Sequence, residues 1–152
     1  MISAEHSYRI AILGGDGIGP EVMASAVMVL EAIQETSPLT FDLRSYLCGA
    51  SCYQQLGDPL PLKTIQGCRQ ADAILLGAMG LPDVRWPDGT EMRPQVDLRF
   101  KLDVYAGLRP IYLYHSDHTP IKGLSQGDID FVIVRENVEG LFASMNSQSA
   151  PS

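Results

Sequence analysis

Basic residues are scarce in this sequence of 152 residues. Lysine and arginine number 11 against 18 aspartates and glutamates, so the formal net charge at pH 7 is -7 and the pI is about 4.8. An acidic chain repels phosphate backbones, and we therefore expect no nucleic-acid partner. No apolar run approaches the ~20 residues that span a bilayer, and the first ten residues lack the cationic start and apolar core of a secretory signal. We expect neither membrane insertion nor secretion.

Cysteine is also scarce, with only Cys48, Cys52 and Cys68 in the chain. An odd number in no compact pattern argues against a disulfide framework and indicates a reducing compartment, so we expect a cytoplasmic protein. Cys48 and Cys52 have the spacing of a zinc-ligand pair, but no second pair or nearby histidine completes the site. Two half-buried thiols are therefore the simpler interpretation. The three histidines also lack the paired spacing of ligands, and we predict no metal site within this chain.

The apolar segments predict an α/β fold with a parallel sheet. The chain has room for one domain of ordinary size, and its 45% hydrophobic and 19% charged residues are typical of a globular protein. Short apolar or alternating runs predict strands at 8–14, 39–46, 72–80, 111–115 and 128–134. Helical periodicity and proline positions predict helices at 17–35, at 59–70 and within 97–110, the last ending near Gly107, before Pro110. Strands that alternate with helices are typical of a parallel sheet.

Three further local expectations follow from composition. The run at 72–80 is apolar throughout, which indicates a strand buried on both faces, and 128–134 also reads as a buried strand. The segment 81–97 contains three prolines and a glycine and is expected to be a loop. Residues 145–152 are small and polar, and we predict that they form a disordered tail.

A glycine-rich segment, GGDGIGPE at 14–21, joins the first predicted strand to the first predicted helix. Glycines in this position let a ligand approach the backbone, and a helix N-terminus attracts anions. The glycines fall at 14, 15, 17 and 19, which is not the G-x-G-x-x-G spacing of the dinucleotide fingerprint. A ligand-binding loop and a plain tight turn are equally good interpretations.

Three arginines, Arg99, Arg109 and Arg135, are the candidate ligand-binding residues. Arg109 and Arg135 each lie at the boundary of a predicted element, where side chains can meet at a pocket. The guanidinium fork matches a carboxylate, so three arginines would hold a substrate with two or three carboxylates. Ordinary surface arginines are the alternative, because the sequence does not show that the three converge. Arg135 opens the segment RENVEGLF, in which three polar residues follow an apolar strand at once.

Four segments in this order closely resemble the β-decarboxylating dehydrogenases: ILGGDGIGPEV, DAILLGAMG, DLRFKLDVYAGLRP and VIVRENVEGLF. This family includes isopropylmalate, isocitrate, tartrate and D-malate dehydrogenases, and the resemblance covers residues 8 to about 144. It implies an α/β sandwich that is not a Rossmann fold, with residues 1–144 as its N-terminal part. It also implies a reaction in which NAD or NADP takes a hydride from C2 of a 2-hydroxy di- or tricarboxylic acid. The 3-carboxylate then leaves as CO2, the enol is reprotonated, and Mg or Mn chelates the C2 oxygen as a Lewis acid.

The resemblance also implies roles for individual residues. The family's three carboxylate-binding arginines match Arg99, Arg109 and Arg135. Ile18 matches the glycine loop beside the cofactor, and Gln95 matches the loop near the nicotinamide and the third substituent of the substrate.

Substrate preference within the family depends on positions that Arg93 and Gln95 match here. Isopropylmalate enzymes favour leucines at these two positions, whereas this chain has two polar residues. We therefore expect a tartrate-, malate- or isocitrate-like substrate in preference to isopropylmalate.

Two departures from the family pattern bear on activity. Phe142 stands where the family has a tyrosine that donates a proton to the enol. A phenyl ring has no proton to donate, so we favour the interpretation of Phe142 as a core aromatic residue. The family's catalytic lysine, metal-binding aspartates and adenine loop belong to a C-terminal half that these residues do not include. That half also completes the first sheet and the homodimer interface, so we expect exposed strand edges and a need for a covering partner.

Two hypotheses about function follow. In the first, the chain is the N-terminal part of an NAD(P)-dependent oxidative decarboxylase and has little or no activity alone. In the second, it is a non-catalytic relative that binds a diacid or regulates a complete subunit. Phe142 and the missing metal ligands suit the second hypothesis, whereas the loss of half the fold suits the first, which we favour.

Overall fold

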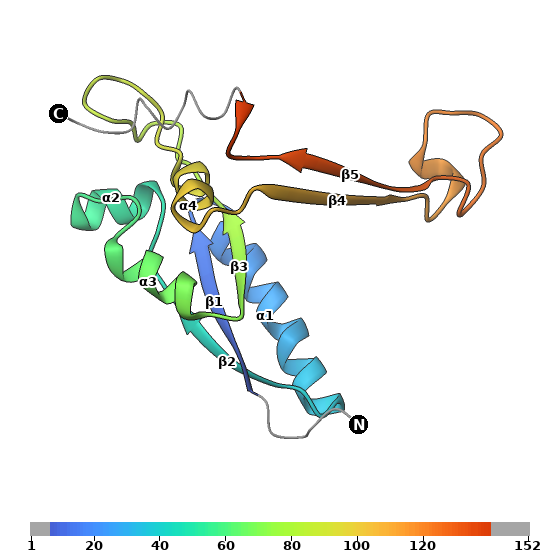
Figure 1. Cartoon of the computed structure of the whole chain (residues 1–152), viewed down its shortest axis with the longest axis horizontal. Helices are drawn as coiled ribbons and strands as arrows, with labels where there is room; N and C mark the ends of the chain where they lie inside the picture. Colours follow the sequence, from blue (N-terminus) through green and yellow to red (C-terminus); the bar gives the residue numbers. More distant parts are fainter. Residues whose placement is uncertain (1–6, 141–152) are drawn as a thin grey trace. The chain divides into compact units, whose positions relative to one another are not determined.

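The computed structural model describes residues 7–140 (Figure 1). Phe142 and the predicted tail at 145–152 lie outside the described residues. The chain divides into two compact units, Met1–Leu102 and Asp103–Ser152, which are described separately below. The assignment of 1–144 to part of one family domain stays a prediction.

The first unit is built on a three-stranded parallel sheet in the order β2-β1-β3. The strands are β1 Ser7–Gly15, β2 Thr40–Ser45 and β3 Ala73–Ala78. The central strand, β1, pairs with both neighbours, so that Ile12 lies opposite Ser45 on one side and Leu75 on the other. The predicted parallel α/β sheet is confirmed.

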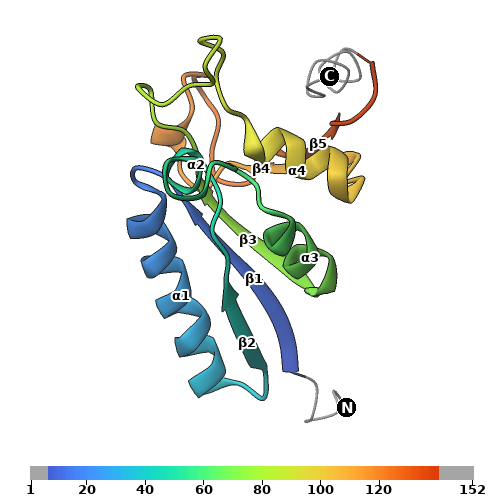
Figure 2. The ribbon, with the colours of Figure 1, turned by 90° about the vertical axis from the view of Figure 1, so that its left-hand side faces the viewer.

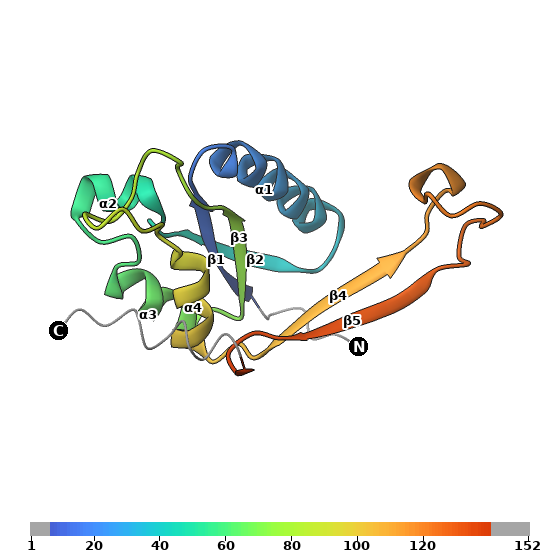
Figure 3. The ribbon, with the colours of Figure 1, turned by 90° about the horizontal axis from the view of Figure 1, so that it is seen from above.

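Helices cover both faces of this sheet. They are α1 Gly19–Thr36, α2 Ala50–Leu56, α3 Leu62–Gln70 and α4 Pro94–Leu102. Figures 2 and 3 show α1 on one face of the sheet and α3 with α4 on the other. The first unit therefore has the three layers of an α/β sandwich.

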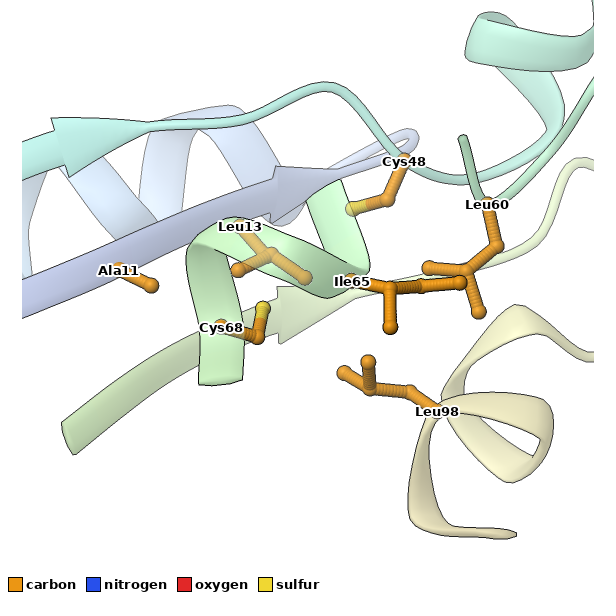
Figure 4. Close-up of a cluster of buried hydrophobic side chains, with 7 residues drawn as sticks. All are labelled: Ala11, Leu13, Cys48, Leu60, Ile65, Cys68 and Leu98. Carbon is orange, nitrogen blue, oxygen red and sulfur yellow. The ribbon is translucent and has the colours of Figure 1, made fainter. Parts of the chain in front are cut away.

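The alternation of side chains along β1 supplies a core to each face. Toward α3 and α4, the buried residues are Ala11, Leu13, Cys48, Leu60, Ile65, Cys68 and Leu98 (Figure 4). Toward α1, Ile10 and Ile12 pack with Met23. Both Ala11 and Leu13 are fully buried, because β1 is the one strand of this sheet with a neighbour on each side.

Several boundaries differ from the sequence prediction. The predicted helix at 97–110 is wrong in its second half: α4 begins at Pro94 and ends at Leu102, since the next residue, Asp103, has a left-handed φ of 54°. The short helix α2 was not predicted at all. The prediction that 72–80 is buried on both faces is also wrong, because Leu76 of β3 is 41% exposed.

The second unit is a two-stranded antiparallel ribbon, in which β4 Ala106–Tyr112 pairs with β5 Asp130–Glu136. Residues 113–129 join the strands and contain the short 3-10 helix η1 Ser116–His118. Pro110 lies within β4, opposite Val132. The strand predicted at 128–134 exists, but its expected burial is wrong: Phe131 is 50% exposed and Val134 68%. The two residues lie on opposite faces of the ribbon, so both of its faces expose apolar side chains.

Across residues 7–140, no helix is both long enough and apolar enough to cross a membrane.

The junction of β1, α1 and β3 depends on glycines that have no Cβ. A Cβ on Gly77 would overlap the carbonyl oxygen of Gly14, whereas a Cβ on Gly14 would meet nothing closer than the Pro20 Cα at 3.8 Å. We predict that Gly77→Ala lowers the free energy of unfolding by about 2 kcal/mol, because the two backbones must separate. Gly14→Ala, a control in the same junction, should change it by less than about 0.5 kcal/mol. Urea unfolding followed by far-UV circular dichroism measures both, and equal losses would contradict the steric explanation.

Candidate functional site

The glycine-rich loop is folded around the buried carboxylate of Asp16. This side chain accepts hydrogen bonds from the backbone N–H groups of Ala50 at 2.7 Å, Ser51 at 2.8 Å and Gly80 at 2.9 Å. Two of these donors form the first turn of α2, and the third follows β3. A Cβ on Gly49 would overlap the carboxylate, so this position must be glycine. Asp16 therefore caps α2 and ties two loops together.

Electrostatics favour the ionised form of Asp16. Burial alone would raise the pKa of its carboxyl group, but the backbone N–H donors of Ser51, Gly80 and Ala50 outweigh burial, and the pKa is lowered. Asp16 was not among the functional residues predicted from the sequence. The available signal was an acidic residue inside a glycine loop, where it can accept bonds from several backbone amides.

The start of α1 is a poor anion site. The Gly19 N–H donates to the Asp16 carbonyl at 2.8 Å, Pro20 has no N–H, and Glu21 adds a negative charge in the first turn. Ile18, in contrast, is 61% exposed at the tip of the loop. The backbone of the loop therefore fits the interpretation as a tight turn. The loop is better suited to an apolar contact through Ile18 than to binding a phosphate group.

The segment between β3 and α4 has structure of its own. The Asp88 carboxylate accepts bonds from the Thr90 N–H at 2.9 Å and hydroxyl at 2.7 Å, and the Trp86 N–H donates to the Thr90 carbonyl at 2.9 Å. The ring of Trp86 packs edge-on against Tyr53 of α2, with centroids 5.1 Å apart. The predicted loop is thus held against α2.

Gln95, in the first turn of α4, has a buried side-chain oxygen that accepts no hydrogen bond within residues 7–140. A buried acceptor without a donor is unfavourable by about 1–3 kcal/mol, unless a ligand or water supplies the donor. Gln95 therefore fits contact with a polar ligand group. Arg99 lies one turn further along α4 and is half-buried.

The register of the ribbon places Arg109 and Arg135 on one face. Arg109 lies opposite Ile133, and Arg135 lies opposite Gly107. Directly opposed residues share a face, as do residues two apart in a strand. Arg109 and Arg135 are therefore diagonal neighbours, with backbones about 7–8 Å apart. We call this side of the ribbon, with Tyr105, Gly107, Arg109, Arg135 and Asn137, the arginine face.

The polar residues after Arg135 turn the chain at the end of β5. The Glu136 carboxylate accepts bonds from the Val138 N–H at 2.9 and 3.0 Å and from the Glu139 N–H at 2.6 Å. Burial would raise the pKa of Glu136, but the backbone N–H donors of Val138, Glu139 and Asn137 outweigh it, and the pKa is lowered. Asn137 extends the strand pairing, since its N–H donates to the Tyr105 carbonyl at 2.8 Å.

The structure thus brings Arg109 and Arg135 together, whereas Arg99, Gln95 and Ile18 belong to the first unit. The roles of all five residues stay predictions. Phe142, at the family's tyrosine position, lies outside the described residues.

The described residues do not fit a metal ion. Between residues 7 and 140, no group of three or more His, Cys, Asp or Glu side chains is arranged to hold one. The cysteines are free and buried, and burial raises the pKa of Cys48 to about 12 and also raises the pKa values of Cys52 and Cys68. The thiols stay protonated at neutral pH, and a metal binds the thiolate.

Comparison with known proteins decides the family. The profile described as isocitrate/isopropylmalate dehydrogenase matches residues 9–152. The chain belongs to the isocitrate/isopropylmalate dehydrogenase family. The 3-isopropylmalate dehydrogenase of Bacillus subtilis (strain 168) is 41% identical over 146 residues, which cover 92% of this chain and 40% of that protein. The enzyme of the same name from Thermobifida fusca (strain YX) is 43% identical over 140 residues, covering 91% and 39%.

Solved structures of the family have the same fold over this part. An isocitrate dehydrogenase from Methylococcus capsulatus matches with a TM-score of 0.69 and 32% identity, covering 90% of this chain and 36% of its own. The apo form of a β-decarboxylating dehydrogenase from Thermococcus kodakarensis matches with a TM-score of 0.64 and 36% identity, covering 88% and 35%. The chain spans about 40% of the length of the curated relatives it matches. The expected family fold is confirmed.

The three bonds to Asp16 give a prediction about stability and pH. Asn in place of Asp16 keeps one acceptor oxygen but turns an N–H2 group toward a backbone donor, so Asp16→Asn should lower the free energy of unfolding by about 2 kcal/mol at pH 7. Because the folded pKa lies below the ordinary 3.8, the carboxylate stabilises the fold above that value and ceases to do so as pH falls through the folded pKa. The difference between wild type and variant should therefore shrink below pH 3.8.

Urea unfolding at a series of pH values tests this. Asp88→Asn is the matched control, because Asp88 is exposed and its bonding partner among residues 7–140 is the nearby Thr90, so its effect should be smaller at every pH. A constant difference for Asp16→Asn between pH 7 and pH 3 would contradict the role given to the charge.

Proposed function

We propose that this chain forms the substrate-binding part of an NAD(P)-dependent oxidative decarboxylase that acts on 2-hydroxy di- or tricarboxylic acids of the 3-substituted malate type. The register that puts Arg109 and Arg135 on one face of the ribbon carries this proposal. Two guanidinium forks at diagonal positions suit a ligand with carboxylates a few bonds apart. The assignment of Arg99 to the same substrate rests on the family resemblance alone.

The chemistry requires that two substrate carboxylates be held while bonds change between them. The C2–H leaves as hydride, the hydroxyl proton is lost, and the bond from C3 to its carboxylate breaks to give CO2. Bound NAD or NADP supplies the hydride acceptor in such a reaction. Arginine remains charged at all physiological pH values, so Arg109 and Arg135 keep both carboxylates ionised and oriented. Exposed Ile18 offers the cofactor an apolar contact, and Gln95 offers an acceptor oxygen. No step is assigned to Mg or Mn, since the described residues do not fit a metal ion.

A polar substituent at C3 of the substrate is favoured over an isopropyl group. The buried oxygen of Gln95 needs a hydrogen-bond donor, and Arg93, two residues before it, is exposed. A hydroxyl group at C3, as in tartrate, supplies a donor, whereas an isopropyl group does not. We therefore propose a tartrate-like substrate on this contact, and malate- or isocitrate-like acids on the family resemblance at Arg93 and Gln95, in contrast to the substrate named in the curated relatives.

We further propose that these residues do not complete turnover by themselves. The chain spans about 40% of the length of its relatives. The exposed apolar side chains of β5 favour a covering partner, and a family-type dimer would supply one. Three free, buried cysteines suit a reducing, cytoplasmic setting.

Ligand binding tests the arginine face directly. We expect NMR titration to detect binding of malate or tartrate to the chain, and Arg109→Lys to weaken it about tenfold, because lysine lacks the bidentate fork. Arg44→Lys is the matched control: Arg44 is an exposed strand arginine whose ion pair with Asp42, at 2.7 Å, a lysine can keep. Absence of binding, or equal affinity in Arg109→Lys, would overturn the proposal. Reduction of NAD at an ordinary rate by this chain alone would overturn the expected inactivity.

Gln95 gives a test of substrate preference. Gln95→Leu should weaken tartrate binding roughly fivefold and strengthen binding of 3-isopropylmalate, because an apolar group replaces the acceptor. The same change removes a buried atom without a donor, so thermal stability should not fall. Gln54→Leu, at an exposed position of α2, should leave both affinities unchanged. If wild type prefers 3-isopropylmalate to tartrate and malate, the proposed substrate class is wrong.

A further inference from the structure

Asp97 places a negative charge between two residues of the proposed site. It belongs to the first turn of α4, two residues after Gln95 and two residues before Arg99. An α-helix rises ~1.5 Å per residue, so Asp97 lies about 3 Å along the helix axis from each of them. The carboxyl group is therefore within one helical turn of both residues that α4 contributes to the proposed site.

Neighbouring cations compensate the charge of Asp97 only in part. Burial raises the pKa of its carboxyl group, whereas Lys101 and Arg93, four residues after it and before it, oppose this shift, and the pKa is raised overall. The two cations are exposed, whereas Asp97 is half-buried. Solvent screens an exposed charge more strongly than a partly buried one. The carboxylate therefore contributes more to the potential beside Gln95 than either cation does.

The effect of such a charge depends on the substituent at C3 of the substrate. Malate, tartrate and isocitrate share a 2-hydroxy diacid skeleton, and at C3 they carry a hydrogen, a hydroxyl group and a carboxymethyl group. Isocitrate alone among the three brings a further negative charge. If the C3 substituent lies beside Gln95, that charge approaches Asp97, and like charges in a partly buried site repel each other. The neutral substituents of malate and tartrate meet no such repulsion.

We propose that Asp97 is a specificity-determining residue that disfavours substrates with a third carboxylate and so restricts the site to 2-hydroxy dicarboxylic acids. This inference rests on the proposed function, in which Arg109 and Arg135 hold two carboxylates and Gln95 meets the C3 substituent. It narrows the proposed substrate class from di- and tricarboxylic acids to dicarboxylic acids.

Other acidic residues of the first unit are less suited to this role. Asp16 is buried, and its carboxylate accepts three backbone N–H bonds that hold the glycine-rich loop. Asp88 is exposed and accepts bonds from Thr90. Glu91 is also exposed and precedes α4. Asp97 combines partial burial with a position inside the helix that carries Gln95 and Arg99.

The test compares malate with isocitrate, which differ only in the carboxymethyl group at C3. NMR titration of the full chain should show that wild type prefers malate. In Asp97→Asn, isocitrate affinity should rise about fivefold, because the repulsion is removed, while malate and tartrate affinities stay the same. The affinity of 3-isopropylmalate, which has a bulky but uncharged C3 substituent, should not change either. An acid that only stabilises the first turn of α4 would change all affinities together.

Further variants separate the charge from the fold. Asp97→Ala covers the case in which Asp97→Asn does not fold, because alanine has the highest helix propensity, and it should also raise isocitrate affinity. Asp97→Glu keeps the charge and should keep the preference for malate. Glu35→Gln is the control for net charge and should also keep it. Glu35 is exposed in the last turn of α1, a helix about 27 Å long whose other end meets the glycine-rich loop.

The outcomes separate this inference from the proposed function. If Arg109→Lys loses malate while Asp97→Asn and Asp97→Ala keep the wild-type ratio of malate to isocitrate affinity, the role of Asp97 is overturned and the arginine assignment stands. A wild type that binds isocitrate as tightly as malate also overturns the role of Asp97 alone. If wild type binds none of these acids, both are overturned.

Discussion

The buried carboxylate of Asp16 organises the end of the parallel sheet at which the glycine-rich loop lies. Asp16 draws the backbone N–H groups of α2 and of the loop after β3 onto a single side chain. A carboxylate enclosed by protein must be satisfied by several donors, and here all three come from backbone. The position of Gly80, and with it the start of the segment that leads to α4, is therefore fixed by a residue in the first glycine loop. The apolar tip at Ile18 is presented by the same turn.

Sequence periodicity was sufficient for the elements whose stabilising contacts are local. β1, α1 and β3 were predicted because apolar spacing and a proline start determine them. The short helix α2 was not predicted, since it has no capping side chain of its own: its cap comes from Asp16, 34 residues earlier. The helix predicted at 97–110 extended too far, because the left-handed conformation of Asp103 does not follow from residue type alone.

For the candidate site, too, the local features could be predicted and the non-local ones could not. Arg109 and Arg135 were selected from the chemistry of arginine. Their position on one face depends on the register between β4 and β5, which are joined by residues 113–129. The burial of two strands could not be predicted from the sequence. Apolar composition correctly indicated that 72–80 and 128–134 form strands, but it does not show which other elements cover them. Among the described residues, both strands expose large apolar side chains.

The position of Pro110 makes the two edges of the ribbon unequal. The N–H of Leu113 points toward β5, since it donates to the Ile129 carbonyl, and along β4 the inward groups alternate with outward ones. The nitrogen of Pro110 therefore faces away from β5, and it has no hydrogen to donate. The outer edge of β5 contains no proline. A further strand that paired with β4 would lack the hydrogen bond that the N–H of a residue at position 110 would donate. A strand that paired with β5 would meet no such interruption, so an added strand should pair with β5 in preference to β4.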